Sequence, residues 1–175
     1  MRKFIFLTWC VLFSTNCFCA VKLGVYLGPT IPMGELYKFL NTGINVHTFL
    51  NTKVLLPFEL STGIAYHEKK TAPKIKLISI PLVLSYVKNF HLYNSYPVFF
   101  KTGLGVMFET ISGLDIGISN YDPVFVLGLG TSLRKKRVSL LIKITYSFVF
   151  QRYINLAKYD GHFLSFNIGT YIFRY

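Results

Sequence analysis

The sequence predicts an all-β fold, an eight-stranded antiparallel up-and-down transmembrane β-barrel. The mean hydropathy of +0.44 is high for a soluble domain, yet no stretch after residue 20 is long and apolar enough for a spanning helix. Apolar and polar residues alternate in many segments, and the chain ends in the aromatic-rich FNIGTYIFRY at 166–175. A membrane barrel combines these features. Its outer face is apolar, whereas the small and polar residues of its inner face lower the hydropathy of each strand.

Residues 1–20 are expected to form a cleaved signal peptide, which leaves one barrel domain at 21–175. Arg2 and Lys3 precede an apolar run at 4–13, and a more polar stretch with small residues follows. Cleavage is expected after Cys19 or Ala20. A single membrane anchor is the alternative, but the run is shorter than the roughly 20 apolar residues of a spanning helix. All three cysteines lie in this segment, so the exported domain has no disulfide framework.

The first four predicted strands are separated by polar turns. In the third, Leu60 and Ile64 share an apolar face suited to contact with lipid, whereas Glu59 and Gly63 lie on the other face. The fourth contains the apolar run LISIPLVLSYV. These strands are 21–28, 43–50, 54–66 and 74–88.

The last four predicted strands show the clearest alternation. In the fifth, Phe100 and Leu104 lie on one face and Gly103 and Gly105 on the other, and the seventh repeats this pattern. The strands are 96–112, 124–133, 138–152 and 162–175.

The eighth strand needs a change of phase. Its apolar residues fall on two opposite faces, and a bulge near Gly169 would turn both sets outward. Without the bulge, Ser165 and Asn167 would face lipid. The two sets are Leu164, Phe166 and Ile168, and Tyr171, Phe173 and Tyr175.

The connections alternate in length, as they do in small outer-membrane barrels with short periplasmic turns and longer external loops. With an even number of strands, both termini fall on the periplasmic side. The predicted external loops are 29–42, 68–73, 113–123 and 153–161, and the predicted short connections are 51–53, 89–95 and 134–137.

The segments KIKLISIPLVLSYV at 74–87 and YPVFFKTGLGVMFE at 96–109 resemble the outer-membrane β-barrel domain family of small, eight-stranded, porin-like proteins. The opening KLGVYLGPTIP at 22–32 and the terminal aromatic residue fit the same pattern. The resemblance implies a location in the outer membrane of a Gram-negative-type bacterium. It also implies that the barrel-insertion machinery reads the C-terminal strand. The family has no shared catalytic residues to transfer.

The predicted function is structural, adhesive or surface-interacting, without enzymatic activity, cofactor, metal or nucleic-acid partner. The protein is expected to be a monomer. Eight strands enclose an interior that side chains can fill, so a wide pore is not expected. The four histidines fall on different elements without metal-ligand spacing. The two GLG sequences lack the following helix that a phosphate-binding loop needs.

Two alternative functions come from other classes. A lipid A-modifying enzyme would need a base beside a nucleophile, but His162 and Ser165 fall on opposite faces of a regular strand. A secreted lipocalin-like barrel would turn its apolar face inward. The only tryptophan, Trp9, lies in the signal segment rather than in a first strand, where lipocalins keep one.

Two groups of charged residues are candidate sites. Charged side chains on the inner face would pair across the lumen, because an unpaired buried charge is costly. We therefore predict an ion network of Glu59, Lys101 and Lys143, with a second polar layer of Glu109 and Gln151.

A second group lies in the basic segment HEKKTAPKIK at 67–76. Its lysines are predicted to contact lipopolysaccharide phosphates at the membrane surface, with an ordinary solvated loop as the alternative. They are Lys69, Lys70, Lys74 and Lys76.

Overall fold

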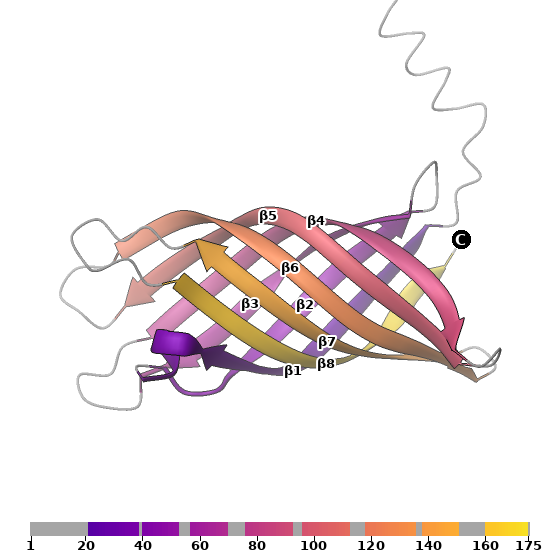
Figure 1. The fold of residues 1–175 in the computed structure, drawn as a ribbon, viewed down its shortest axis with the longest axis horizontal. Coiled ribbons are helices and arrows are strands. Elements are labelled where there is room, and N and C mark those ends of the chain that lie inside the picture. Colours follow the sequence, from indigo (N-terminus) through magenta and orange to yellow (C-terminus); the bar gives the residue numbers. More distant parts are fainter. Residues whose placement is uncertain are drawn as a thin grey trace, which may run out of the picture.

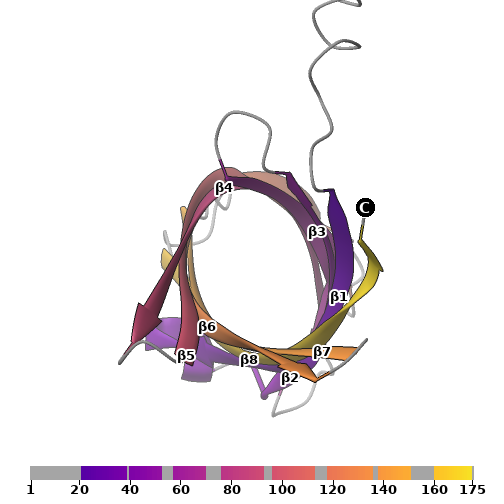
Figure 2. The ribbon, with the colours of Figure 1, turned by 90° about the vertical axis from the view of Figure 1, so that its right-hand side faces the viewer.

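The computed structural model describes residues 21–38, 40–52, 57–69, 76–92, 96–112, 118–135, 138–150 and 160–174. Within these ranges eight strands form one closed barrel, in which each strand pairs antiparallel with the next and β8 closes on β1 (Figures 1 and 2). The predicted fold class is confirmed. The elements are β1 (Lys22–Met33), the 3-10 helix η1 (Gly34–Lys38), β2 (Gly43–Thr52), β3 (Phe58–Glu68), β4 (Lys76–Leu92), β5 (Tyr96–Ser112), β6 (Ile118–Lys135), β7 (Val138–Phe150) and β8 (Asp160–Arg174).

The two ends of the barrel differ in what they carry. The end where β1, β3, β5 and β7 finish is called the loop end, and η1 lies there (Figure 1). The opposite end, where β1 begins and β8 finishes, is called the turn end. Every long predicted connection joins strands at the loop end, and every short one joins them at the turn end.

Among the eight strands, β1 and β6 extend furthest past their predicted bounds, and the added residues of each include proline. Beyond Thr30, β1 pairs with β8 alone, so Pro32 has no second ladder to break. Likewise, residues 118–123 of β6 pair only with β5, and this ribbon accommodates Pro123. The predicted loops at 29–42 and 113–123 are therefore wrong at their edges.

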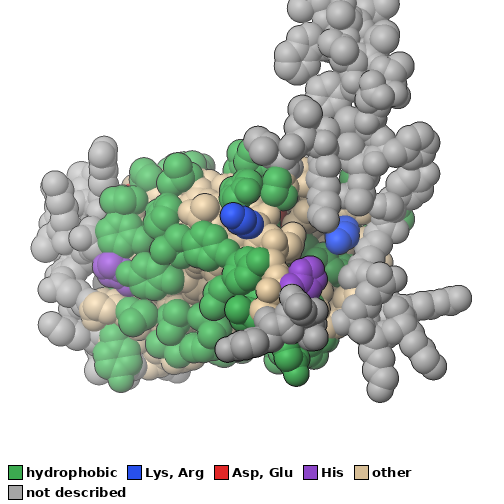
Figure 3. Space-filling model, turned by 45° about the vertical axis from the view of Figure 1, so that its right-hand side comes forward, with side chains coloured by type: hydrophobic (Ala, Val, Ile, Leu, Met, Phe, Trp, Pro, Cys, Tyr) green, Lys and Arg blue, Asp and Glu red, His purple; other side chains and the backbone are tan. Residues whose placement is uncertain are grey.

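The outer surface of the barrel is apolar along its wall (Figure 3). Leu27, Ile44 and Leu104 are 56%, 64% and 67% exposed, whereas Glu59 on the inner face is 4% exposed. The faces predicted for the third, fifth and seventh strands are confirmed over their described residues. An apolar outer face is the reverse of a lipocalin surface, so the lipocalin-like alternative does not fit this barrel. No helix among the described residues is long and apolar enough to cross a membrane.

The bulge in β8 is present but lies nearer the terminus than predicted. Leu23 pairs with Phe173 and Gly24 with Tyr171, so Ile172 is the additional residue. As a result Phe173 faces outward, whereas Tyr171 turns inward against Phe49 with ring centroids 5.7 Å apart. The prediction of an outward Tyr171 was wrong. Tyr175 lies outside the described residues, as do 1–20.

Candidate functional site in the barrel lumen

A buried ion pair lies in the lumen near the turn end. Lys101 on β5 places its Nζ 2.5 Å from Glu59 Oε1 on β3, with β4 between the two strands. The same ammonium group donates to Ser61 Oγ at 3.1 Å. The side chains of Lys101 and Glu59 are only 3% and 5% exposed, so each charge is compensated inside the barrel rather than by bulk water.

Lys143 does not join this pair. It is 5% exposed, and its Nζ lies 3.8 Å from the centre of the Tyr26 ring, which makes a cation–π contact. Within the described part of the chain, no carboxylate is within ion-pair distance of this ammonium group. The structure thus brings together two of the three predicted network residues and gives the third an aromatic partner.

Aromatic side chains fill the lumen at the turn end, each beside a glycine of a neighbouring strand. Tyr26 and Phe49 pack at 4.8 Å between centroids and form a core cluster with Leu141. In the strand register, Phe49 is opposite Gly24, Tyr26 opposite Gly169, and Phe99 opposite Gly130. The glycines make room for rings, in agreement with the sequence interpretation of small inward residues rather than a phosphate-binding loop.

A second polar layer lies toward the loop end. Glu109 is 1% exposed and accepts a hydrogen bond from Ser79 Oγ at 3.3 Å. Asp122 is equally buried, although its position was predicted to be in an external loop. The alternation Asn120, Asp122, Val124 continues the inward face of β6 and was the signal that the sequence offered for it. Gln151 lies outside the described residues.

The segment after β1 folds over the loop end instead of extending from it. Leu36 on η1 and the nearby Leu40 are 8% and 6% exposed, and they belong to an apolar cluster inside the barrel. His67 Nδ1 lies 3.1 Å from the carbonyl of Asn41, and the Asn41 N–H donates to the carbonyl of Glu68 at 2.7 Å. We call this segment, residues 34–41, the lid. The other buried residues of the apolar cluster that contains Leu36 and Leu40 are Leu77, Val83, Met107, Val124, Val126, Val149 and Phe163.

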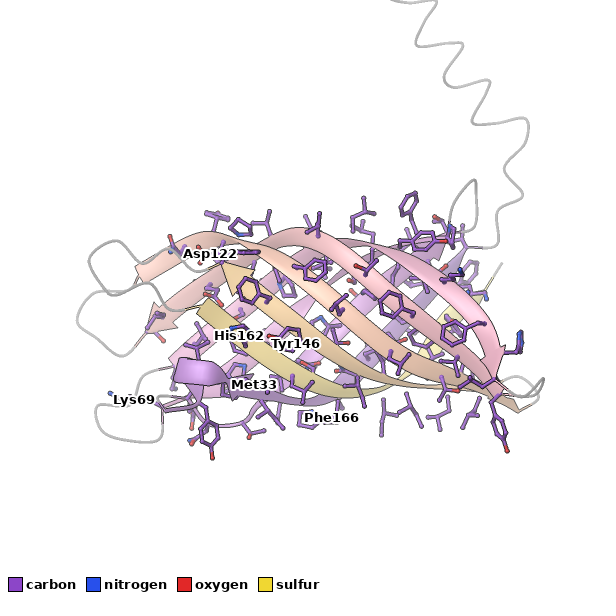
Figure 4. The ribbon with its side chains drawn as sticks, viewed as in Figure 1. Met33, Lys69, Asp122, Tyr146, His162 and Phe166 are labelled. Carbon is purple, nitrogen blue, oxygen red and sulfur yellow. The ribbon has the colours of Figure 1, made fainter. Side chains whose placement is uncertain are left out.

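The residues considered for enzymatic chemistry lie on opposite faces of β8. His162 faces outward, where its ring Nδ1 hydrogen-bonds the Tyr146 hydroxyl and its ring contacts Phe148 (Figure 4). Ser165 faces the lumen and donates to Thr30 Oγ1 at 3.0 Å. The two side chains therefore form no base–nucleophile pair. The described residues also contain no group of three side chains able to hold a metal ion.

The predicted lysine cluster is only partly described. Lys69 lies at the loop end, in an isolated bridge with Leu40 of the lid, and Lys76 is exposed at the start of β4 (Figure 4). Glu68 and Lys76 are register partners on adjacent strands. Lys70 and Lys74 lie outside the described residues.

Among the solved structures that are similar to this chain are three bacterial proteins. Neisserial surface protein A has 12% sequence identity and a TM-score of 0.64, and the match covers 86% of this chain and 95% of that one. Ail of Yersinia pestis, crystallised with the heparin analogue sucrose octasulfate, has 11% identity, coverage of 90% and 97%, and a TM-score of 0.49. The N-terminal β-barrel domain of Pseudomonas aeruginosa OprF has 12% identity, coverage of 86% and 97%, and a TM-score of 0.45.

The sequence matches no protein-family model and no curated protein. The likeness to Neisserial surface protein A confirms the predicted fold, that of small eight-stranded outer-membrane barrels.

Proposed function

We propose that this chain is a small integral outer-membrane barrel of structural, adhesive or surface-interacting type, with a closed lumen. The observation that carries the proposal is the filling of the lumen along its length. Aromatic rings and the Lys101–Glu59 pair occupy the lumen toward the turn end, and Leu36 and Leu40 of the lid cover the loop end. Between these layers, the described residues enclose a cavity of about 50 Å³.

The outward surface supports the membrane placement. A band of exposed Leu, Ile, Val and Phe side chains along every strand would be costly in water and favourable in hydrocarbon. We further propose an outer membrane of the Gram-negative type, export by the signal peptide at 1–20, and insertion through recognition of the last strand. Phe173 and Ile172 at the end of β8 are 52% and 65% exposed and supply an apolar surface for that recognition.

An enzymatic role is not part of the proposal. Ser165 is buried in the lumen and is held by Thr30, so outward-facing His162 has no serine at hand to activate. A partner at the cell surface would instead meet the loop end, which carries the lid and the longer connections.

The proposal is tested by fractionating cells that express the full chain and by measuring the conductance of the purified barrel in planar bilayers. We expect the protein in the outer-membrane fraction, with different gel mobility before and after boiling. We also expect no sustained conductance above the bilayer background. Recovery in a soluble fraction would contradict the membrane placement, and long-lived conductance steps would contradict the closed lumen.

Lipopolysaccharide is the proposed lipid partner of the lysines at the loop end. Replacing Lys69 and Lys76 with Gln should reduce the amount of anionic lipid that copurifies with the barrel, and the loss should be largest at low salt, where charge contacts are least screened. The matched control is Lys88→Gln, because Lys88 is exposed near the turn end of β4. Equal lipid retention by all three proteins at low ionic strength would favour an ordinary solvated loop.

A further inference from the structure

A cavity of about 50 Å³ remains at mid-height in the lumen, with space for roughly three to five water-sized groups. Its lining combines apolar side chains with a basic and amide-bearing polar part, to which His47 and His67 also belong. Lys101, Lys143, Asn45, Asn167 and Thr145 all contribute to the polar part, and no carboxylate of the described residues does. The loop-end layer borders the cavity through Ser79, which lines it and donates to Glu109. A cation would find no negative side chain in the cavity wall.

Several polar groups that line the cavity have no partner within the described part of the chain. Asn45 is 1% exposed, and neither its Nδ2 nor its Oδ1 makes a hydrogen bond. Thr145 Oγ1 and Asn167 Oδ1 are also buried without partners. Buried polar atoms are almost always satisfied by protein, water or ligand, because leaving them unpaired costs free energy. The cavity is therefore built to hold something polar.

The two asparagines lie on the strands on either side of β1, level with Gly28. Asn45 on β2 is the register partner of Gly28. On the β8 side, the Cα of Asn167 lies 3.0 Å from the position that a Cβ on Gly28 would occupy. A side chain at position 28 would meet the backbone of β8, so glycine keeps this part of the wall thin.

The charges around the cavity do not balance. Lys101 is compensated by Glu59, but Lys143 contacts the Tyr26 ring and no carboxylate. A cation–π contact offsets only a small part of the cost of burying a full charge. A bound negative charge of small size would complete the compensation and would accept hydrogen bonds from the donors that lack partners.

We propose that the cavity binds one small monovalent anion of the halide class, chloride being the abundant example. The ammonium group of Lys143, the Asn45 amide and the Thr145 hydroxyl would donate to it, and water would fill the remaining volume. The anion would fix the middle of the lumen by linking β2 and β7. This inference concerns the interior alone and stands whether or not the loop end binds a surface partner.

The test compares the refolded full-length barrel in chloride and in gluconate at equal ionic strength, with gel mobility as the measure of the folded fraction. A ligand that binds only the folded state multiplies the folded-to-unfolded ratio by one plus its concentration over its dissociation constant, about tenfold at ten times that constant. We expect this gain for the unmodified protein and its loss in Lys143→Met. Lys88→Met, which removes an exposed lysine, should keep the gain.

A second measurement keeps the proposal testable if Lys143→Met does not fold. Crystals of the unmodified barrel grown with bromide in place of chloride should show an anomalous peak inside the cavity, near Lys143 Nζ. Three results would overturn the proposal: equal stability of the unmodified protein in chloride and gluconate, an equal chloride gain in Lys143→Met, or a cavity without a bromide peak. In each case water alone would fill the space.

Discussion

Replacing Glu59 with Gln is expected to lower the free energy of unfolding by about 3 kcal/mol, near the lower end of the cost of breaking a buried ion pair. The variant removes the carboxylate that lies 2.5 Å from Lys101 Nζ and leaves a buried ammonium group with the Ser61 hydroxyl at 3.1 Å. Gln still offers a carbonyl acceptor, which keeps the loss at the lower end. Urea unfolding of the refolded barrel in lipid vesicles measures the change, provided that the slope with denaturant stays constant.

Glu68→Gln is the matched control, because Glu68 is exposed at the loop end of β3 and serves there as the acceptor for Tyr66 at 2.5 Å. Its expected effect is within about 0.5 kcal/mol, as for most surface changes. Adding Lys101→Met to Glu59→Gln should recover part of the loss, since both buried charges are then gone. Equal destabilisation by Glu59→Gln and Glu68→Gln would show that the pair contributes nothing beyond an ordinary surface carboxylate.

The Lys101–Glu59 contact illustrates what sequence reasoning can reach in a barrel. Alternation with period two assigns each side chain to the inner or outer face, and counting from the strand starts gives an approximate depth. Depth alone does not choose between partners, because strand stagger shifts each strand along the axis. Lys101 and Lys143 each lie five residues after the start of their strand. Even so, Lys143 contacts Tyr26 on β1, two strands away from β7.

The lid illustrates what period two does not predict. The described residues of the lid, 34–38, 40 and 41, lie outside the strands, and alternation has no meaning there. Leu36 and Leu40 are apolar residues in a segment predicted to be an external loop, and their hydrophobicity was the available signal. Their destination is an apolar cluster with residues of β4 to β8, and these strands enclose a common interior only once the barrel has closed.

Gly130→Ala is expected to destabilise the barrel by about 2 kcal/mol, within the usual cost of overpacking a tightly packed interior. A Cβ at position 130 would lie 2.4 Å from Cζ of Phe99 and 2.5 Å from the carbonyl oxygen of Ile142. The Phe99 ring can turn away, but only by leaving the turn-end packing. The carbonyl belongs to the backbone of β7 and moves only with the strand. The gel-mobility melting curve and urea unfolding both report the loss.

Gly128→Ala is the control, since Gly128 lies two residues away on the same inward face of β6. There a Cβ would meet Lys101 Cβ at 3.4 Å and backbone or hydroxyl atoms at 3.6 and 3.7 Å, which are ordinary contact distances. Neither glycine has a positive φ, so alanine lowers the conformational entropy of the unfolded chain without straining the folded backbone. Gly128→Ala should therefore be neutral or slightly stabilising. The sequence GLG does not distinguish these two glycines, because their difference comes from the ring of Phe99 on the neighbouring strand. Similar losses at both positions would mean that the Phe99 ring does not lie over Gly130.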